Sequence, residues 1–373
     1  MSSFRLPFNK TILPGFHDGV ATLSDGEPDD DVALFIINKQ LTTNGNNVRQ
    51  LWITGEGREK KLLMFKQQAA AMPTPPTNIT FAQSALSGRD YPPEMTESFI
   101  DLCTAQDDGA GTALEYDAVL SLRQFLESCE NPLVVVIKPF PELLAMPSAL
   151  LAKTTVAIYG SFNFRCMFDS VGKENLASFI NNSFLRVILY ETYFVLDEDN
   201  SINNVNAPRF YETICRNAEK YRYWRCVKHR IAIWNRHIYA AQLKNSLKTL
   251  TLMNSMIATE ESNIAAAVTA DELENVWKQR KHNADKYSTG MKIVNSIIAA
   301  RGQQMVFADF GLAVLLFDCG AEALASGPIL RADISFAEGR GNTVCTPNVN
   351  SKVYVIGRLD REKLVNCLIK AIE

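Results

Sequence analysis

Short apolar runs alternate with helical segments through the first half of the chain, and this alternation constrains the fold more than any other feature. The clearest run, PLVVVI at residues 132–137, is apolar at nearly every position, as strands buried on both faces of a parallel sheet are. Similar runs occur at residues 20–23, 48–55, 78–85, 154–160 and 185–192. Because strands that alternate with helices form mostly parallel sheets, the sequence predicts the α/β class, with an open, mostly parallel sheet and flanking helices.

The middle of the chain, residues 208–302, has a helical pattern rich in basic and aromatic residues. Since no Pro- or Ser-rich linker flanks it, we expect a helical layer or insertion within one domain that spans residues 1–373. Its basic stretch at 222–236 could contact a phosphate, although a solvated helix face is the favoured interpretation. Its aromatic and histidine side chains either stack on a bound ring or protonate it, or they pack the helices together. These side chains are Tyr221, Tyr223, Trp224, His229, Trp234, His237 and Tyr239. A turn-rich stretch at 339–348, an apolar run at 351–360 and a final helix are expected to close the chain.

Composition excludes several classes of protein. The net charge of -3 gives no electrostatic footprint for nucleic acid or an anionic membrane. No run of about 18 apolar residues predicts a membrane span, and the N-terminal segment lacks a signal-peptide core, so we expect a soluble, cytoplasmic protein. The 8 cysteines are scattered and are expected to be reduced. The 4 histidines form no H-x-x-x-H pair, which argues against a histidine-based metal site.

Acidic residues crowd the turn that follows the first apolar run. Asp25, Glu27, Asp29, Asp30 and Asp31 stand directly before the apolar segment VALFII. One interpretation is a solvated turn and helix start, because Asp, Gly and Pro favour both. The other is a cation site, because hard divalent ions bind carboxylate oxygens. The acids themselves leave both interpretations open.

Five separated segments resemble, in order and approximate spacing, the inosine–uridine-preferring nucleoside hydrolases. The family's D-P-G-x-D-D turn is similar to D-G-E-P-D-D at 25–30, and its T-G-x-L-T-N-I-A segment to K-P-F-P-E-L-L-A at 138–145. Its E-F-N, H-D-P-x-A-V-A and T-R-G-x-T-V-V-D segments look like S-F-N, A-D-F-G-L-A-V and E-G-R-G-N-T-V-C at 161–163, 308–314 and 338–345. The resemblance covers nearly the whole chain.

The resemblance implies a metal-dependent hydrolase that cleaves the N-glycosidic bond of a nucleoside or a related ribosyl compound. It implies one calcium ion in a pocket at the strand ends, with Asp25 as a ligand and as the general base. Asp30, Asp309 and the backbone carbonyl of Lys138 would complete the protein ligands. The residues implied to bind substrate are Asp29, Asn163 and Glu56, of which Glu56 stands where the family has an asparagine. Family members are commonly dimers or tetramers, so a homo-oligomer is possible, with a small-molecule ligand and no nucleic acid or membrane partner.

Several positions depart from the family pattern, among them the P-G of the acidic turn, which is G-E at Gly26 and Glu27. Lys138 replaces a threonine, Glu56 an asparagine, Ser161 a glutamate and Ala308 a histidine. The Lys138 ammonium could occupy the ion's place among the aspartates, or it could point to the surface. The alternative function is therefore a catalytically inactive relative that binds a ribosyl or ADP-ribosyl ligand, or a protein partner, in the same cleft.

Overall fold

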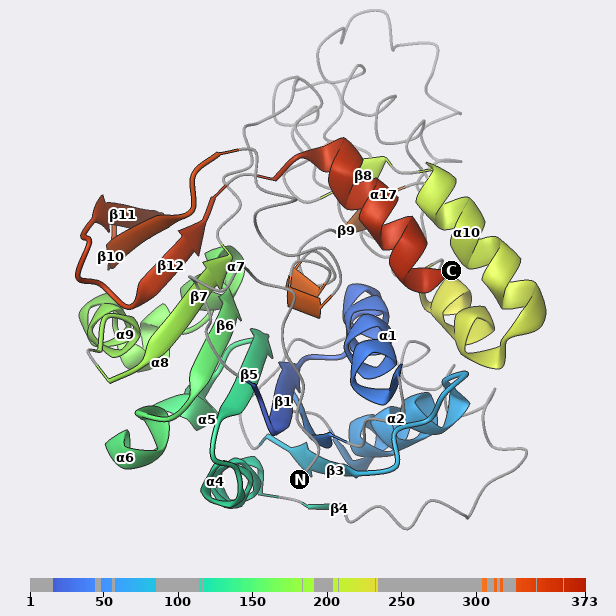
Figure 1. Cartoon of the computed structure of the whole chain (residues 1–373), viewed down its shortest axis with the longest axis horizontal. Helices are drawn as coiled ribbons and strands as arrows, with labels where there is room; N and C mark the ends of the chain where they lie inside the picture. Colours follow the sequence, from blue (N-terminus) through green and yellow to red (C-terminus); the bar gives the residue numbers. More distant parts are fainter. Residues whose placement is uncertain are drawn as a thin grey trace, which may run out of the picture.

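A computed structural model gives the fold of the chain (Figure 1). The structure describes residues 16–43, 48–55, 58–84, 114–115, 117–182, 184–190, 204–206, 208–231, 233, 304–306, 312–313, 316–317, 327–339, 341–357 and 359–373. Among these residues, no helix is both long enough and apolar enough to cross a membrane.

A single large sheet organises the described part of the chain, with ten strands in the order β11-β10-β12-β7-β6-β5-β1-β2-β3-β4. The parallel strands are β1 (Gly19–Ser24), β2 (Arg49–Thr54), β3 (Ile79–Gln83), β4 (Leu114–Glu115), β5 (Pro132–Ile137), β6 (Thr155–Tyr159), β7 (Arg186–Tyr190) and β12 (Val353–Ile356). Two antiparallel strands, β10 (Leu330–Phe336) and β11 (Thr343–Pro347), extend the sheet beyond β12. The predicted class, an open and mostly parallel sheet with flanking helices, is confirmed.

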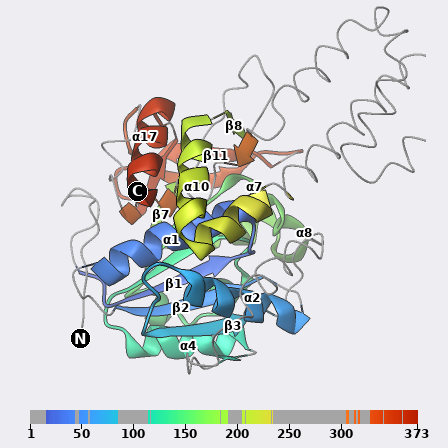
Figure 2. The same cartoon turned by 90° about the vertical axis from the view of Figure 1, so that its right-hand side faces the viewer.

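Helices cover both faces of this sheet. One face packs against α1 (Pro28–Thr42), α2 (Arg58–Ala71), α10 (Pro208–Lys220), a helical stretch at 222–231 and α17 (Arg361–Ile372). The other packs against α4 (Ala118–Ser128), α5 (Pro141–Leu144), α6 (Ser148–Leu151), α7 (Ser161–Arg165), α8 (Phe168–Val171) and α9 (Lys173–Ile180). Figure 2 shows α4 and α10 on opposite sides of the strands.

Strand β5 illustrates why the sheet lies at the centre of the molecule. All six of its residues are buried, and successive side chains enter opposite cores, Val135 on the side of α1 and Val134 on the side of α4. Each fully buried valine or leucine contributes about 1.5–3 kcal/mol of transfer free energy. A polar residue at alternate positions would therefore be costly, which explains the apolar run in the sequence.

The order of the strands reverses beside β1. From β1 the chain passes to β2, β3 and β4 on one side, whereas β5, β6 and β7 lie on the other. In open α/β sheets ligands bind outside the carboxyl ends of the strands at such a reversal. The segments that follow β1 and β5 therefore stand where a binding site is expected.

Two sequence-based expectations at the end of the chain need correction. The stretch expected to be turn-rich contains β11, which pairs with β10 in an antiparallel hairpin. Residues with turn propensity occur here within a strand at the end of the sheet, where the partner strand β10 fixes their conformation. The expectation that all cysteines are reduced is wrong for Cys367, which is disulfide-bonded, because pairing depends on spatial proximity rather than on spacing along the chain.

The single-domain prediction for residues 1–373 remains a prediction. Of the expected helical layer at 208–302, the structure describes α10, residues 221–231 and residue 233, and these are helical except at residue 221. A cytoplasmic location also remains a prediction, and a disulfide is more typical of oxidising compartments.

Candidate functional site

The carboxyl edge of the sheet gathers most of the predicted site residues. Ser24 at the end of β1 pairs in register with Ile137 at the end of β5. Asp25 and Lys138 are therefore the next residues along two neighbouring parallel strands, and Asn163 follows β6 at the same edge. Two other predicted site residues, Glu56 and Asp309, lie outside the described residues, as does Ala308.

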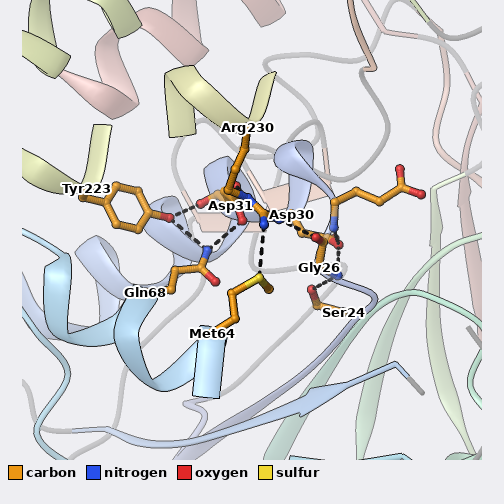
Figure 3. Close-up of polar contacts among 9 residues, drawn as sticks. Ser24, Gly26, Asp30, Asp31, Met64, Gln68, Tyr223 and Arg230 are labelled. Atoms are coloured by element: carbon orange, nitrogen blue, oxygen red, sulfur yellow. Dashed lines mark hydrogen bonds and ion pairs between the residues drawn. The ribbon is translucent and has the colours of Figure 1, made fainter. Parts of the chain in front are cut away.

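The turn of residues 25–30, called the acid turn below, is closed by Asp30 (Figure 3). One carboxylate oxygen, Oδ2, accepts the backbone N–H groups of Gly26 at 2.7 Å and Glu27 at 2.8 Å. Gly26 has a φ of 80°, a conformation that side chains disfavour, and its N–H also lies 3.2 Å from the Ser24 hydroxyl. The helix α1 then begins at Pro28, a residue well suited to the first helical position. The sequence here builds a tight turn whose shape depends on one carboxylate.

Burial makes the acid turn electrostatically unusual. Asp29, Asp30 and Asp31 are only 4%, 0% and 0% exposed, so the solvated-turn interpretation is wrong for these three residues. Burial raises the pKa of Asp30 well above its ordinary value, and the nearby Asp25 and Asp29 carboxylates raise it further. The Asp25 carboxyl lies within hydrogen-bonding reach of Asp30. Like charges held this closely in a low-dielectric site require a shared proton or a cation.

Lys61 is a cation beside this turn that the sequence did not point to. Its ammonium nitrogen lies 3.3 Å from the backbone carbonyl oxygen of Asp25, and its side chain is largely buried. Burial lowers the pKa of Lys61, while the Asp25 and Asp30 carboxylates raise it. Lys61 therefore supplies positive potential to the acid turn from α2. Its position in a helix of mixed composition gave no signal of this role.

The fifth acid of the cluster, Asp31, serves the core rather than the strand-end site. Its Oδ2 accepts the Nε–H of Arg230 at 2.8 Å, and both side chains are fully buried. Gln68 donates to the other oxygen at 2.9 Å, and the Tyr223 hydroxyl donates to the Asp31 backbone carbonyl. Burial raises the pKa of Asp31 to about 6, although Arg230 and Gln68 lower it.

The expectation of a solvated basic face at 222–236 is therefore wrong for Arg230. The preceding residues Arg225, Lys228 and His229 are exposed, so Arg230 differs from them in the face of the helix on which it lies. A partner acid 199 positions away gave no signal in the sequence.

Lys138 has neither of the two orientations expected for it. Its ammonium nitrogen lies 2.7 and 2.9 Å from the two carboxylate oxygens of Glu142 and 2.8 Å from the Pro139 carbonyl oxygen. The Lys138 and Glu142 side chains are 3% and 1% exposed. These three acceptors match the three N–H donors of an ammonium group. Lys138 is thus buried, so the expected surface orientation is wrong. Its partner Glu142 lies outside the acid turn, so the expected place among the aspartates is wrong as well.

Asn163 is held near the same edge by its own strand end. Its Nδ2 donates to the Tyr159 carbonyl oxygen at 3.2 Å, and its side chain is 7% exposed. Its carbonyl oxygen thus remains the group of this side chain that could meet a sugar hydroxyl. The predicted sugar contact stays a prediction.

Two of the aromatic residues of the middle segment pack the helices together, which is one of the two alternatives expected for them. Tyr223 and Trp224 are buried against Phe35 of α1, with ring centroids 5.6 and 4.6 Å from it. Tyr221 and His229 are exposed, and Trp234, His237 and Tyr239 lie outside the described residues.

The predicted calcium ligands are only partly described. Asp25 and Asp30 lie together in the acid turn, and the described residues contain no group of three His, Cys, Asp or Glu side chains placed to hold a metal ion. A buried and a partly buried carboxylate within hydrogen-bonding reach of each other fit a hard cation in chemistry and charge. The third predicted carboxylate, Asp309, falls outside the described ranges, so calcium binding stays a prediction.

Comparisons with known proteins show similarity to two effector structures. The chain matches no protein-family model, and no curated protein matches it. The effector protein XOO4466 matches with a TM-score of 0.47 and 15% identity, over 97% of this chain and 95% of that chain. The type III effector protein XopQ, complexed with adenosine diphosphate ribose, matches with a TM-score of 0.41 and 14% identity, over 95% of this chain and 92% of that chain. Both similarities are weak, so the chemistry of the site is inferred from the residues of this chain.

Proposed function

We propose that this chain binds the ribosyl group of a nucleoside or related compound at the carboxyl edge of its sheet and hydrolyses the N-glycosidic bond. The observation that carries the proposal is the acid turn itself: Asp29 and Asp30 are buried, and the Asp25 carboxyl lies within hydrogen-bonding reach of Asp30, where the strand order reverses. Cleavage of a glycosidic bond develops positive charge on the sugar ring. A cluster of buried carboxylates at this edge supplies the negative potential that such a sugar requires.

Each acid of the turn has a separate role in the proposal. Asp25 is less buried than Asp29 and Asp30, and it is the carboxylate that would take a proton from the attacking water. Asp29 and Asn163 would bind the sugar hydroxyls, together with Glu56. Asp25, Asp30, Asp309 and the Lys138 carbonyl would hold calcium, which when bound lowers the pKa of a water molecule.

The pairing of Lys138 with Glu142 supports this assignment. An ammonium group that occupied the cation position would be expected to contact Asp25 or Asp30. In the described residues its three hydrogen bonds go to Glu142 and Pro139 instead. Lys61, a proton or a bound cation must therefore neutralise the negative charge of the acid turn.

Calorimetry with calcium tests the metal part of the proposal. Wild-type protein is expected to bind calcium, and Asp30→Asn to lose binding, because two carboxylates rarely hold such an ion alone. Asp169→Asn, the same chemical change at an exposed position on α8, is the matched control and should bind as wild type does. The metal assignment fails if the wild type shows no binding at millimolar calcium.

Release of free ribose tests the catalytic part. Wild type is expected to release ribose from at least one member of a nucleoside panel, and Asp25→Asn to bind the same compound without cleaving it. A second candidate, ribosyl or ADP-ribosyl binding without cleavage, is favoured by the replacement of family site residues by Glu56, Ser161 and Ala308. Binding of ADP-ribose by wild type with no ribose released from any compound would select that candidate.

A further inference from the structure

The guanidinium of Arg230 joins three segments that meet behind the acid turn (Figure 3). It donates to the Asp31 carboxylate in α1 at 2.8 Å, to the backbone carbonyl of Gly26, and to the sulfur of Met64 in α2 at 3.1 Å. Arg230 is 0% exposed, and it comes from the helical stretch at 222–231. One buried side chain from the middle of the chain therefore contacts the turn built near its N-terminus.

Gly26 is held from both sides by these contacts. Its N–H donates to Asp30 within the turn, and its carbonyl accepts from Arg230 outside it. Gly26 has no side chain to restrict its rotation, and its carbonyl shares a peptide group with the Glu27 N–H, which donates to Asp30 at 2.8 Å. Loss of the Arg230 contact would release the carbonyl and with it the peptide whose N–H orients Asp30.

We propose that Arg230 is the positioning residue of the acid turn, so that the carboxylates of Asp25, Asp29 and Asp30 converge only while the 222–231 helix is docked. This inference rests on the proposed function for what the converged carboxylates bind. The geometry also separates the acids by task. Asp31, which follows the acid turn, forms the ion pair with Arg230.

Asp31 is the residue that holds Arg230 in place. Gln68 and Arg230 bind its two carboxylate oxygens, and Tyr223 binds its backbone carbonyl. These contacts come from α2 and from the 222–231 helix, so α1, α2 and that helix meet at one carboxylate. A guanidinium can span this carboxylate and the Gly26 carbonyl because its donors diverge from a planar fork, whereas an ammonium is a single point.

Two variants separate positioning from folding. Arg230→Met with Asp31→Asn removes the guanidinium without leaving a buried unpaired charge, so the chain should still fold. Arg230→Lys keeps the charge but cannot reproduce the fork. Arg225→Met, an exposed change on the same helix, is the matched control. Urea unfolding of each variant gives the global stability against which local effects are judged.

Hydrogen exchange of the Gly26 and Glu27 amides in metal-free protein is the decisive measurement. Loss of a hydrogen bond to a charged donor should speed this exchange by about tenfold or more in the double variant. Arg230→Lys should lie between the double variant and wild type, and Arg225→Met should match wild type. Wild-type exchange of both amides in the folded double variant would overturn the inference, whatever the protein binds.

Calcium titrations of the same proteins distinguish failure of the inference from failure of the proposed function. If wild type binds calcium, the double variant should bind about tenfold more weakly, in proportion to the faster exchange. Unchanged affinity and unchanged exchange would remove the positioning role and leave the proposed function standing. Absence of calcium binding in wild type would count against the proposed function, and the exchange data would still decide the positioning role.

Discussion

Removing the Glu142 charge should destabilise the protein strongly, because Glu142 is the buried counter-ion of Lys138. The ammonium lies 2.7 and 2.9 Å from the two carboxylate oxygens, and both side chains are almost fully buried. Glu142→Gln keeps the shape of the side chain and leaves a buried ammonium without an opposite charge. Breaking a buried pair in this way costs about 3–5 kcal/mol of the free energy of unfolding.

A double change should restore most of that loss. Lys138→Met with Glu142→Leu replaces both charges by apolar groups of similar size, and such replacements are often near neutral or stabilising. The double variant should therefore unfold within about 1 kcal/mol of wild type. The difference between single and double variants measures the uncompensated charge rather than the lost packing.

An exposed pair elsewhere in the chain provides the control. Arg123 and Glu127 form a similar contact at 3.0 Å with side chains 56% and 51% exposed. Glu127→Gln should cost no more than about 0.5 kcal/mol, since exposed pairs contribute little. Urea unfolding followed by tryptophan fluorescence is suitable, because Trp52 and Trp224 are buried. The reasoning is refuted if Glu142→Gln loses as little as Glu127→Gln, or if the double variant loses as much as Glu142→Gln.

The same pair decides whether the ammonium competes with a cation. Lys138→Thr leaves the Glu142 carboxylate buried and unpaired, so it should melt earlier than wild type with calcium and with chelator alike. Its calcium-dependent shift in melting temperature should equal that of wild type if Lys138 serves Glu142 alone. A calcium-dependent shift seen only in Lys138→Thr would mean that the ammonium holds the cation's place.

Two further predictions concern stability away from the acid turn. Gly341→Ala should reduce the free energy of unfolding, measured in urea, more than Gly339→Ala does. Both glycines have positive φ, 69° and 67°. An added Cβ at Gly341 would lie 2.2 Å from the Phe168 ring, whereas an added Cβ at Gly339 would lie within 4 Å of no atom of the described residues. The backbone conformation costs each about 1–2 kcal/mol, so equal losses would contradict the clash. Burial lowers the pKa of His17 below its ordinary 6.5, hence the folded state binds its proton less readily than the unfolded state and stability falls as pH drops below that value. His17→Gln should flatten the decline between pH 7 and 5 in urea titrations, and parallel curves for the two proteins would exclude this contribution.

The fold was predictable because its signals are local and repeated. Strands such as β5 and β6 are continuous apolar runs, and burial on both faces of a parallel sheet demands that pattern. The hairpin of β10 and β11 was missed because its burial pattern is mixed and its sequence contains turn residues. Such strands are specified by the partner they pair with, which sequence periodicity does not reveal.

The site was predictable only where one strand end supplies the chemistry. Asp25, Asp29 and Asp30 follow β1 directly, so their positions in the sequence alone predict that they lie close together. Glu142 follows Lys138 by four residues and could have been suspected as its partner from spacing alone. The family resemblance instead suggested that the Lys138 ammonium lies among the aspartates.

Arg230 shows why the remainder of the site could not be predicted. In sequence it is one of several basic residues on a helix, and its exposed neighbours make a solvated face the simplest interpretation. Its burial follows from the docking of that helix on α1 and α2, where its guanidinium donates to the Asp31 carboxylate and to the Met64 sulfur. Because an unpaired buried guanidinium is costly, this docking and the placement of Asp31 must be satisfied together. The acid turn therefore depends on a long-range pairing that no local pattern records, and variants of Arg230 test that dependence more directly than variants of the acids themselves.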